Sequence, residues 1–210
     1  MIPNNQLSSV AIVNNYLPPN TELYRPTESA SLGGDSLGDS GDNLVTKTWL
    51  AKYNSDTNEV TIESDTDAPE LLFVRPDITE ISLSYDQNMR PTVAFMEDGV
   101  ATLWWYDSQV SDQVFTQYPD ATDPRVILDD RRPWAIGDSD NLLFYVKNDN
   151  LYMRIQRERF QDEHLLKENL NGQRLWRVST NNSLRIMFEF GERRPVKLDA
   201  FIPDTPSTIR

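Results

Sequence analysis

Residues 91–107 read PTVAFMEDGVATLWWYD, in which only Asp98 and Gly99 separate two runs of apolar and aromatic residues. Both residues tolerate the positive φ that a two-residue hairpin turn requires, and the flanking runs favour strands. The stretch therefore predicts a β-hairpin that turns at Asp98-Gly99. It contains no arrangement of side chains typical of a reaction centre.

The same pattern of strand, polar turn and strand occurs three more times. Turns rich in Asn and Asp are predicted near Asp56, at Asn148-Asp149-Asn150 and at Asn181-Asn182, between runs that favour strands. Repeats of roughly 40–50 residues with several strands each are typical of propeller blades, although the uneven spacing of the turns also fits packed sheets of a β-sandwich. We therefore expect an all-β fold of about four hairpin units, propeller-like or sandwich-like.

Composition divides the chain into three parts. Residues 1–43 include YLPPN, YRPTESA and SLGGDSLGDSGD, which are poor in buriable apolar surface and predict an extended arm or linker. Residues 44–194 form the predicted β-rich domain, and the proline-containing residues 195–210 form an extended C-terminal segment. Only residues 158–170 have a helical pattern, and a polar connection between hairpins is the alternative there.

The predicted arm contains one apolar stretch, VAIVNNYL at residues 10–17. Such a stretch before a flexible spacer is suited to docking as an added strand on a neighbouring subunit. A tail without a docking partner is the alternative. The interface candidates in the arm are Val10, Ile12, Val13, Tyr16 and Leu17.

Charge and composition exclude several classes of protein. The 210 residues carry a net charge of −13, which argues against nucleic acid as a direct partner. There is no cysteine, no pattern typical of a signal peptide and no apolar run long enough to span a membrane, so we expect a protein made in the cytoplasm. Residues 1–140 carry a net charge of −16 and residues 141–210 carry +3, which indicates either chance surface asymmetry or packing of oppositely charged faces in an oligomer.

The sequence has no motif that predicts catalysis, a metal site or a cofactor. His164 is the only histidine, and its polar neighbours indicate a surface residue. The Gly-rich segment lacks the lysine of a phosphate-binding loop. Adjacent carboxylates such as Asp129-Asp130 cannot face each other across a cleft, so a glycan-degrading enzyme has no positive support.

Two side-chain groups are candidates for binding. Trp104 and Trp105 point to opposite faces if they lie on one strand. One of them therefore needs a second buried face, a subunit interface or a ligand. We favour the subunit interface, and a bound sugar is the alternative. Arg154, Arg157 and Arg159 predict a basic face if their strand continues, and a solvated sheet edge is the alternative.

Two sequence segments, taken in order, resemble a known family. They are LSYDQNMRPTVAFMEDGVATLWWYDS and then DDRRPWAIGDSDNLLFYVKNDNLYMRIQRERFQDEHLL, and the resemblance covers about residues 44–190. They resemble structural proteins of tailed bacteriophage virions. The matching positions are Ser82, Tyr85, Asp86, Arg90, Pro91, Asp129, Asp130, Arg132, Leu151, Tyr152, Arg154, Gln156, Arg157, Arg159 and Phe160.

The resemblance implies a non-catalytic component of a virion, in the tail or the adsorption apparatus used for host attachment. It implies other virion proteins as partners and assembly in several symmetric copies, a homo-oligomer, and it supplies no active-site residues. The alternative function is a carbohydrate-binding module that recognises a host surface glycan through the aromatic strand.

Overall fold

The computed structural model describes residues 27–34, 46–64, 67–86, 88–129, 139–180 and 185–192. Within these ranges the chain is almost entirely β-strand, and its only helical turn is the short 3-10 helix η1 (Gln156–Glu158). The prediction of an all-β fold built from repeated antiparallel hairpins is confirmed.

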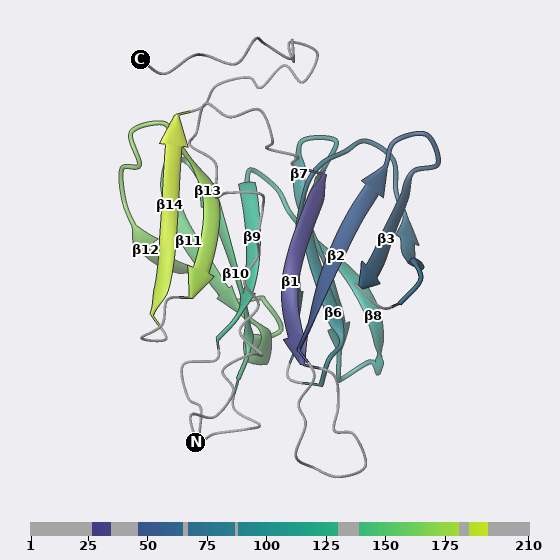
Figure 1. The fold of residues 1–210 in the computed structure, drawn as a ribbon. Helices are drawn as coiled ribbons and strands as arrows, with labels where there is room; N and C mark the ends of the chain where they lie inside the picture. The colour runs from purple at the N-terminus through teal and green to yellow at the C-terminus, as the bar shows by residue number, and fades with distance from the viewer. Residues whose placement is uncertain are drawn as a thin grey trace, which may run out of the picture.

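Consecutive strands form four antiparallel sheets in chain order (Figure 1). The first sheet contains β1 (Glu28–Gly34), β2 (Thr46–Asn54), β3 (Glu59–Ser64) and β4 (Glu70–Val74). The second contains β5 (Ile78–Tyr85), β6 (Pro91–Glu97), β7 (Val100–Asp107) and β8 (Asp112–Tyr118). The third contains β9 (Thr122–Leu128), β10 (Asn141–Lys147), β11 (Asn150–Ile155) and β12 (His164–Lys167). The fourth contains β13 (Gln173–Thr180) and β14 (Ile186–Glu192).

Three of the four predicted hairpin turns lie where the sequence places them. Asp98 and Gly99 adopt φ of 47° and 75° between β6 and β7, and Asn148 and Asp149 adopt 50° and 63° between β10 and β11. The turn near Asp56 joins β2 to β3. The turn at residues 181–182 lies outside the described residues.

One expectation from the sequence was wrong. The segment 1–43 is not wholly an arm, because β1 lies inside it and pairs with β2 from Glu28 opposite Lys52 to Gly34 opposite Thr46. Backbone hydrogen bonds hold this strand, so the low apolar content of its side chains did not reveal it. Residues 158–170, for which a helix and a polar connection were both open, contain the last residue of η1 and then the strand β12.

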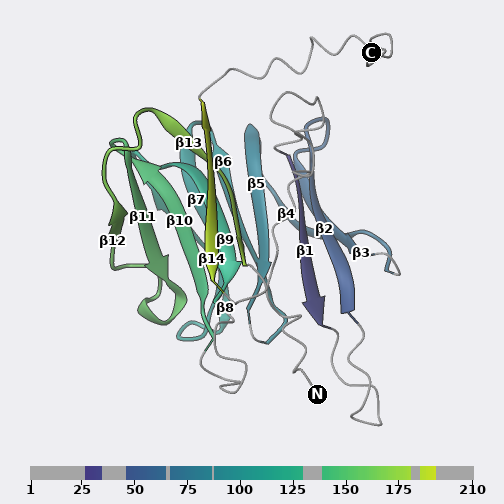
Figure 2. The same cartoon turned by 60° about the vertical axis from the view of Figure 1, so that its left-hand side comes forward.

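The sheets pack face to face, as Figures 1 and 2 show, and each contact between sheets has its own hydrophobic core. Phe73, Phe95 and Trp104 lie in the core between the first and second sheets. Leu103, Trp105 and Tyr145 contribute to the core between the second and third sheets, and Phe144 and Leu175 to the core between the third and fourth. The second and third sheets are therefore buried on both faces.

The first strands of the sheets contact one another in the order β1, β5, β9 and β13. At each contact a side chain of one first strand accepts a hydrogen bond from a backbone N–H of the next. The donor and acceptor pairs are Leu83 N to Ser29 Oγ at 2.9 Å, Val126 N to Ser82 Oγ at 3.1 Å, and Leu175 N to Asp123 Oδ2 at 3.3 Å. Meander sheets packed through their first strands are also how consecutive blades of a propeller are arranged.

Candidate functional site

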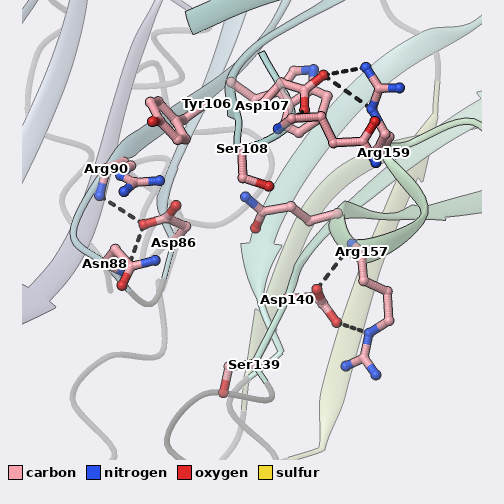
Figure 3. Close-up of a pocket in the computed structure, with 13 residues that line it drawn as sticks. Asp86, Asn88, Arg90, Tyr106, Asp107, Ser108, Ser139, Asp140, Arg157 and Arg159 are labelled. Carbon is pink, nitrogen blue, oxygen red and sulfur yellow. Dashed lines mark hydrogen bonds and ion pairs between the residues drawn. The ribbon is translucent and has the colours of Figure 1, made fainter. Parts of the chain in front are cut away.

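A polar pocket of about 280 Å³ lies at one end of the second and third sheets (Figure 3). Loops and strand ends from both sheets line it, and no single segment of sequence contains all of its residues. We call it the polar pocket. Its charged and amide-bearing lining residues are Asp86, Asn88, Arg90, Asp107, Gln109, Asp140, Gln156, Arg157 and Arg159, and Tyr106 is its most exposed aromatic residue.

Asp86 holds the turn that follows β5. Its Oδ1 accepts hydrogen bonds from the backbone N–H groups of Asn88 at 2.8 Å and Arg90 at 2.9 Å. The residue is only 4% exposed, and these two hydrogen bonds fix its carboxylate in the wall of the pocket. An aspartate is favoured here because its short side chain can bond to backbone N–H groups a few residues ahead.

Asp107 repeats this arrangement at the end of β7 and adds an ion pair. Its Oδ1 accepts from the backbone N–H of Gln109 at 3.0 Å, and its Oδ2 accepts from Nε of Arg159 at 3.1 Å. Burial by itself would raise the pKa of Asp107, but the hydrogen bonds from Arg159 and Gln109 and the positive charge of Arg159 outweigh burial. The pKa of this carboxyl therefore lies below its ordinary value, and the group is ionised at neutral pH.

Asp140 and Arg157 form the second ion pair of the polar pocket. The backbone N–H of Arg157 donates to Oδ1 of Asp140 at 3.1 Å, and Nε of Arg157 contacts Oδ2 of the same carboxylate. These contacts join the start of β10 to η1. The 3-10 turn thus directs Arg157 and Arg159 toward two different aspartates.

Arg90 differs from the other two arginines of the pocket. Its guanidinium carbon lies 3.6 Å from the centroid of the Tyr106 ring, a cation–π contact. Among the residues that the structure describes, no carboxylate forms an ion pair with Arg90. Figure 3 shows Arg90, Tyr106 and Asp86 on one side of the polar pocket and the two aspartate–arginine pairs on the other.

A second pocket of about 310 Å³, the tyrosine pocket, lies between β8 and the third sheet. The rings of Tyr118 and Tyr145 stack with centroids 5.8 Å apart, and Arg154 donates from Nε to the Tyr145 hydroxyl at 2.8 Å. Glu163 accepts from Tyr145, from Lys147 at 3.2 Å and from Arg154 at 3.0 Å.

The tyrosine pocket is held together by its own charges. Burial, followed by the hydrogen bond to Glu163, raises the pKa of Tyr145 well above its usual value. Burial opposes ionisation of Glu163, but its hydrogen bonds with Tyr145 and Lys147 and the charges of Lys147 and Arg154 lower its pKa on balance. The carboxylate is therefore ionised and fully engaged within the protein.

A buried ionic network that the sequence did not predict joins three sheets. Arg125 of β9 is 1% exposed; its Nη2 donates to Oε2 of Glu80 at 3.0 Å and its Nε donates to the carbonyl oxygen of Trp176 at 2.9 Å. Arg174 of β13 contacts the other oxygen of Glu80 and donates to Oδ1 of Asp123 at 2.8 Å. These residues are far apart in the sequence, and β5 and β9 are buried along almost their whole length, so no alternation marks these side chains.

The interface assignment of Trp104 and Trp105 was wrong. The two side chains do point to opposite faces of β7, but they are only 7% and 3% exposed because sheets of the same chain cover both faces. The need for a second buried face is thus met within the chain. The arm candidates Val10, Ile12, Val13, Tyr16 and Leu17 lie outside the described residues.

The predicted basic face was also wrong. The strand β11 ends at Ile155, so Arg157 and Arg159 belong to η1 and its C-terminal end and do not share a strand with Arg154. Arg154 lies in the tyrosine pocket, whereas the other two line the polar pocket. Each guanidinium has a carboxylate partner, so the three residues do not form a common positive surface.

His164 lies on β12 with its side chain 40% exposed, and its Nε2 is 2.6 Å from Oε2 of Glu158. The part of the chain that the structure describes contains no cluster of three or more His, Cys, Asp or Glu residues suited to a metal ion. The described segments also include no helix that could cross a membrane.

Comparison with known proteins finds no matching family model, no matching curated protein and no matching solved structure.

Proposed function

We propose that the chain is a structural component of a tailed bacteriophage virion, in the tail or the adsorption apparatus, and that it assembles through its N-terminal arm and its sheet edges. The sequence resemblance supports the virion context. The proposed mode of assembly is supported by the strands at the edges of the four sheets.

The number of strands described in the fourth sheet is the observation that carries this proposal. The first three sheets have four strands each, whereas the fourth has only β13 and β14 among the described residues. Among the described strands β14 has β13 as its one neighbour, and addition of a further strand beside it is the kind of contact that we propose.

The outer strands of the other sheets carry exposed apolar side chains. Leu71 and Val74 of β4 are 52% and 54% exposed, and Phe115 of β8 is 38% exposed. Leu165 and Leu166 of β12 are exposed to a similar degree. Natural edge strands usually carry charges that prevent association, so apolar side chains at these edges favour docking of partners.

The apolar residues 10–17 provide a strand of suitable composition for such pairing. Residues 1–26 precede the first described residue, Thr27, and β1 begins one position later. Strand addition gains main-chain hydrogen bonds, and alternate apolar side chains give specificity. We propose that this stretch of one copy pairs with a sheet edge of another copy.

Light scattering on the purified full chain and on a chain that lacks residues 1–26 tests the proposal. The truncation stops before β1, because removing residues 1–43 would also remove that strand. We expect a defined oligomer for the full chain and a folded monomer after truncation. A full chain that remains monomeric at every concentration would contradict self-assembly through the arm.

A full-length variant tests whether assembly needs the apolar side chains of the arm or only an arm of this length. Ile12→Asp together with Leu17→Asp keeps the length of the arm but removes apolar contacts, so we expect the same loss of oligomer as on truncation. Asn14→Asp with Asn15→Asp adds the same charge at neighbouring polar positions and should leave the oligomer intact. Equal effects of the two variants would point to charge repulsion instead of strand docking.

A carbohydrate-binding module is the second candidate function. An exposed pair of tryptophans does not carry it, since Trp104 lies in a hydrophobic core and Trp105, which lines the polar pocket, is only 3% exposed. The observation that favours it is the polar pocket, where the Arg90 guanidinium, which pairs with no carboxylate of the described residues, lies near the fixed carboxylate of Asp86.

A further inference from the structure

We propose that the polar pocket binds a neutral saccharide, with Asp86 and Arg90 holding two adjacent hydroxyl groups of one sugar residue. This inference rests on the second candidate function and gives it a location and a ligand class.

The size and lining of the polar pocket suit a small polar ligand. Its volume of about 280 Å³ is close to the lower end of the range for ligand pockets, roughly 300–1,000 Å³. Carboxylate, guanidinium, amide and hydroxyl groups dominate its wall. An apolar ligand would leave these groups without hydrogen-bond partners, which is costly in a desolvated site.

The balance of charge favours a neutral ligand over an ion. Among the described residues, the wall contains three aspartates and three arginines, so the formal charges of these six residues cancel. Asp107 pairs with Arg159 and Asp140 pairs with Arg157, which leaves Asp86 and Arg90. An anion near Arg90 would also meet Asp86, and a cation near Asp86 would also meet Arg90.

Asp86 and Arg90 together offer both kinds of hydrogen-bonding group. Within the described ranges, Asp86 uses Oδ1 for two backbone N–H groups, and its Oδ2 has no hydrogen-bond donor. The Arg90 guanidinium contacts the Tyr106 ring but donates no hydrogen bond to any residue in those ranges. A sugar hydroxyl both donates and accepts, so adjacent hydroxyls match an acceptor beside a set of donors.

Both groups are held in position before a ligand arrives. Two backbone hydrogen bonds of 2.8 and 2.9 Å fix the Asp86 carboxylate, and stacking on Tyr106 restrains the Arg90 side chain. Gln156 adds a third group, because its Oε1 accepts from the Asn141 N–H at 3.1 Å and its amide N–H₂ remains as a donor. Such preorganisation reduces the entropy lost on binding.

The tyrosine pocket is a weaker candidate although it has a similar volume. Its one carboxylate, Glu163, already accepts from Tyr145, Lys147 and Arg154. A ligand would have to break contacts among these side chains.

The test is NMR titration of the ¹⁵N-labelled full chain with trisaccharides of glucose, galactose, mannose, N-acetylglucosamine and rhamnose, each at up to about 10 mM. We expect at least one neutral trisaccharide to shift the backbone amide signals of residues 88–90, 106–109 and 156–159. Arg90→Met and Asp86→Asn should each weaken its binding by about tenfold or more, because each removes a hydrogen bond to a charged group. Asp86→Asn keeps the oxygen that accepts the two backbone hydrogen bonds, so the turn should stay folded.

Arg75→Met is the matched control for Arg90→Met. Arg75 also stacks on an aromatic ring, with its guanidinium carbon 4.3 Å from the centroid of Phe115, but it lies outside the polar pocket. This variant should bind the saccharide as the unaltered chain does. Signals away from each substituted residue report whether the variants are folded.

The possible outcomes distinguish an error in the proposed site from an error in the carbohydrate-binding function. Binding that survives both pocket substitutions would overturn the proposed site while leaving the carbohydrate-binding candidate standing. No binding of any of the trisaccharides would overturn both. Tighter binding of uronic-acid oligosaccharides than of their neutral counterparts would overturn the neutral ligand class.

Discussion

Trp104 and Trp105 are consecutive residues of β7 whose side chains lie in two different hydrophobic cores. Trp104 packs on Phe73 of the first sheet with ring centroids 5.1 Å apart, and Trp105 packs on Phe160 next to the third sheet at 4.9 Å. The second sheet is therefore an inner layer of the protein. Each tryptophan joins it to a different neighbouring sheet.

Substituting either tryptophan should reduce the stability of the single chain. We expect Trp104→Ala and Trp105→Ala each to lower the free energy of unfolding by about 3–5 kcal/mol, because each leaves a large cavity between sheets. Urea denaturation measures this change. Val110→Ala, at a residue that is 55% exposed, should change stability by less than about 0.5 kcal/mol. If only one of the two tryptophan substitutions lowered the free energy of unfolding by this much, the face of the sheet at the other tryptophan would be open.

Removing the charge of Glu80 should destabilise the contact of three sheets. Glu80→Gln leaves Arg125 and Arg174 without their shared carboxylate, and breaking a buried ion pair in this way costs about 3–5 kcal/mol. Glu63→Gln makes the same chemical change in a partly exposed pair with Lys52, where we expect a loss of about 0–1 kcal/mol. Equal unfolding free energies of the two variants would contradict a central role of the buried network.

The Asp107–Arg159 pair should contribute to resistance against acid. The pKa of Asp107 is lowered in the folded protein from its ordinary value of 3.8, so the unfolded chain takes up this proton at a higher pH than the folded chain. The associated stability is fully present above the unfolded pKa and is lost as pH falls through the folded pKa. As the pH falls from roughly 6 to 3, the free energy of unfolding of Arg159→Met should therefore decrease by less than that of the unaltered chain.

Urea denaturation at several pH values measures that difference. Lys52→Met removes the cation of a more exposed pair and should leave the pH dependence of stability unchanged. If Arg159→Met had the same dependence on pH as the unaltered chain, Arg159 would not be the group that holds the pKa of Asp107 down.

The tight turn between β6 and β7 should depend on the backbone freedom of Gly99. The residue has φ of 75°, and a Cβ atom there would meet nothing within 4 Å. Gly99→Ala should therefore cost about 1–2 kcal/mol from backbone strain alone. Asp98→Asn, at φ of 47°, should be nearly neutral because asparagine tolerates this conformation. Thermal unfolding of both variants checks the expectation, and an unchanged midpoint for Gly99→Ala would contradict it.

Much of the local structure was determined by the sequence. Alternating apolar residues and turn residues that accept positive φ were sufficient to place the hairpins at Asp56, Asp98-Gly99 and Asn148-Asp149, because hairpins form between neighbours in the chain. The runs VAFM and LLFYV were also informative. A continuous apolar run is typical of a strand that is buried on both faces, and β6 and β10 are such strands.

Only the tertiary structure decided which faces are covered and which polar residues meet. The sequence required a second buried face, an interface or a ligand for the Trp104–Trp105 pair, but stacking of sheets from distant segments decided in favour of burial. Asp86, Asp107 and Asp140 come together with three arginines because strand ends from two sheets lie side by side. Arg157 and Arg159 were assigned to a strand because periodicity does not report where β11 ends, and there the αL conformation of Arg159 redirects the chain. Contacts between distant residues depend on how whole sheets pack, and no local pattern of residues contains that information.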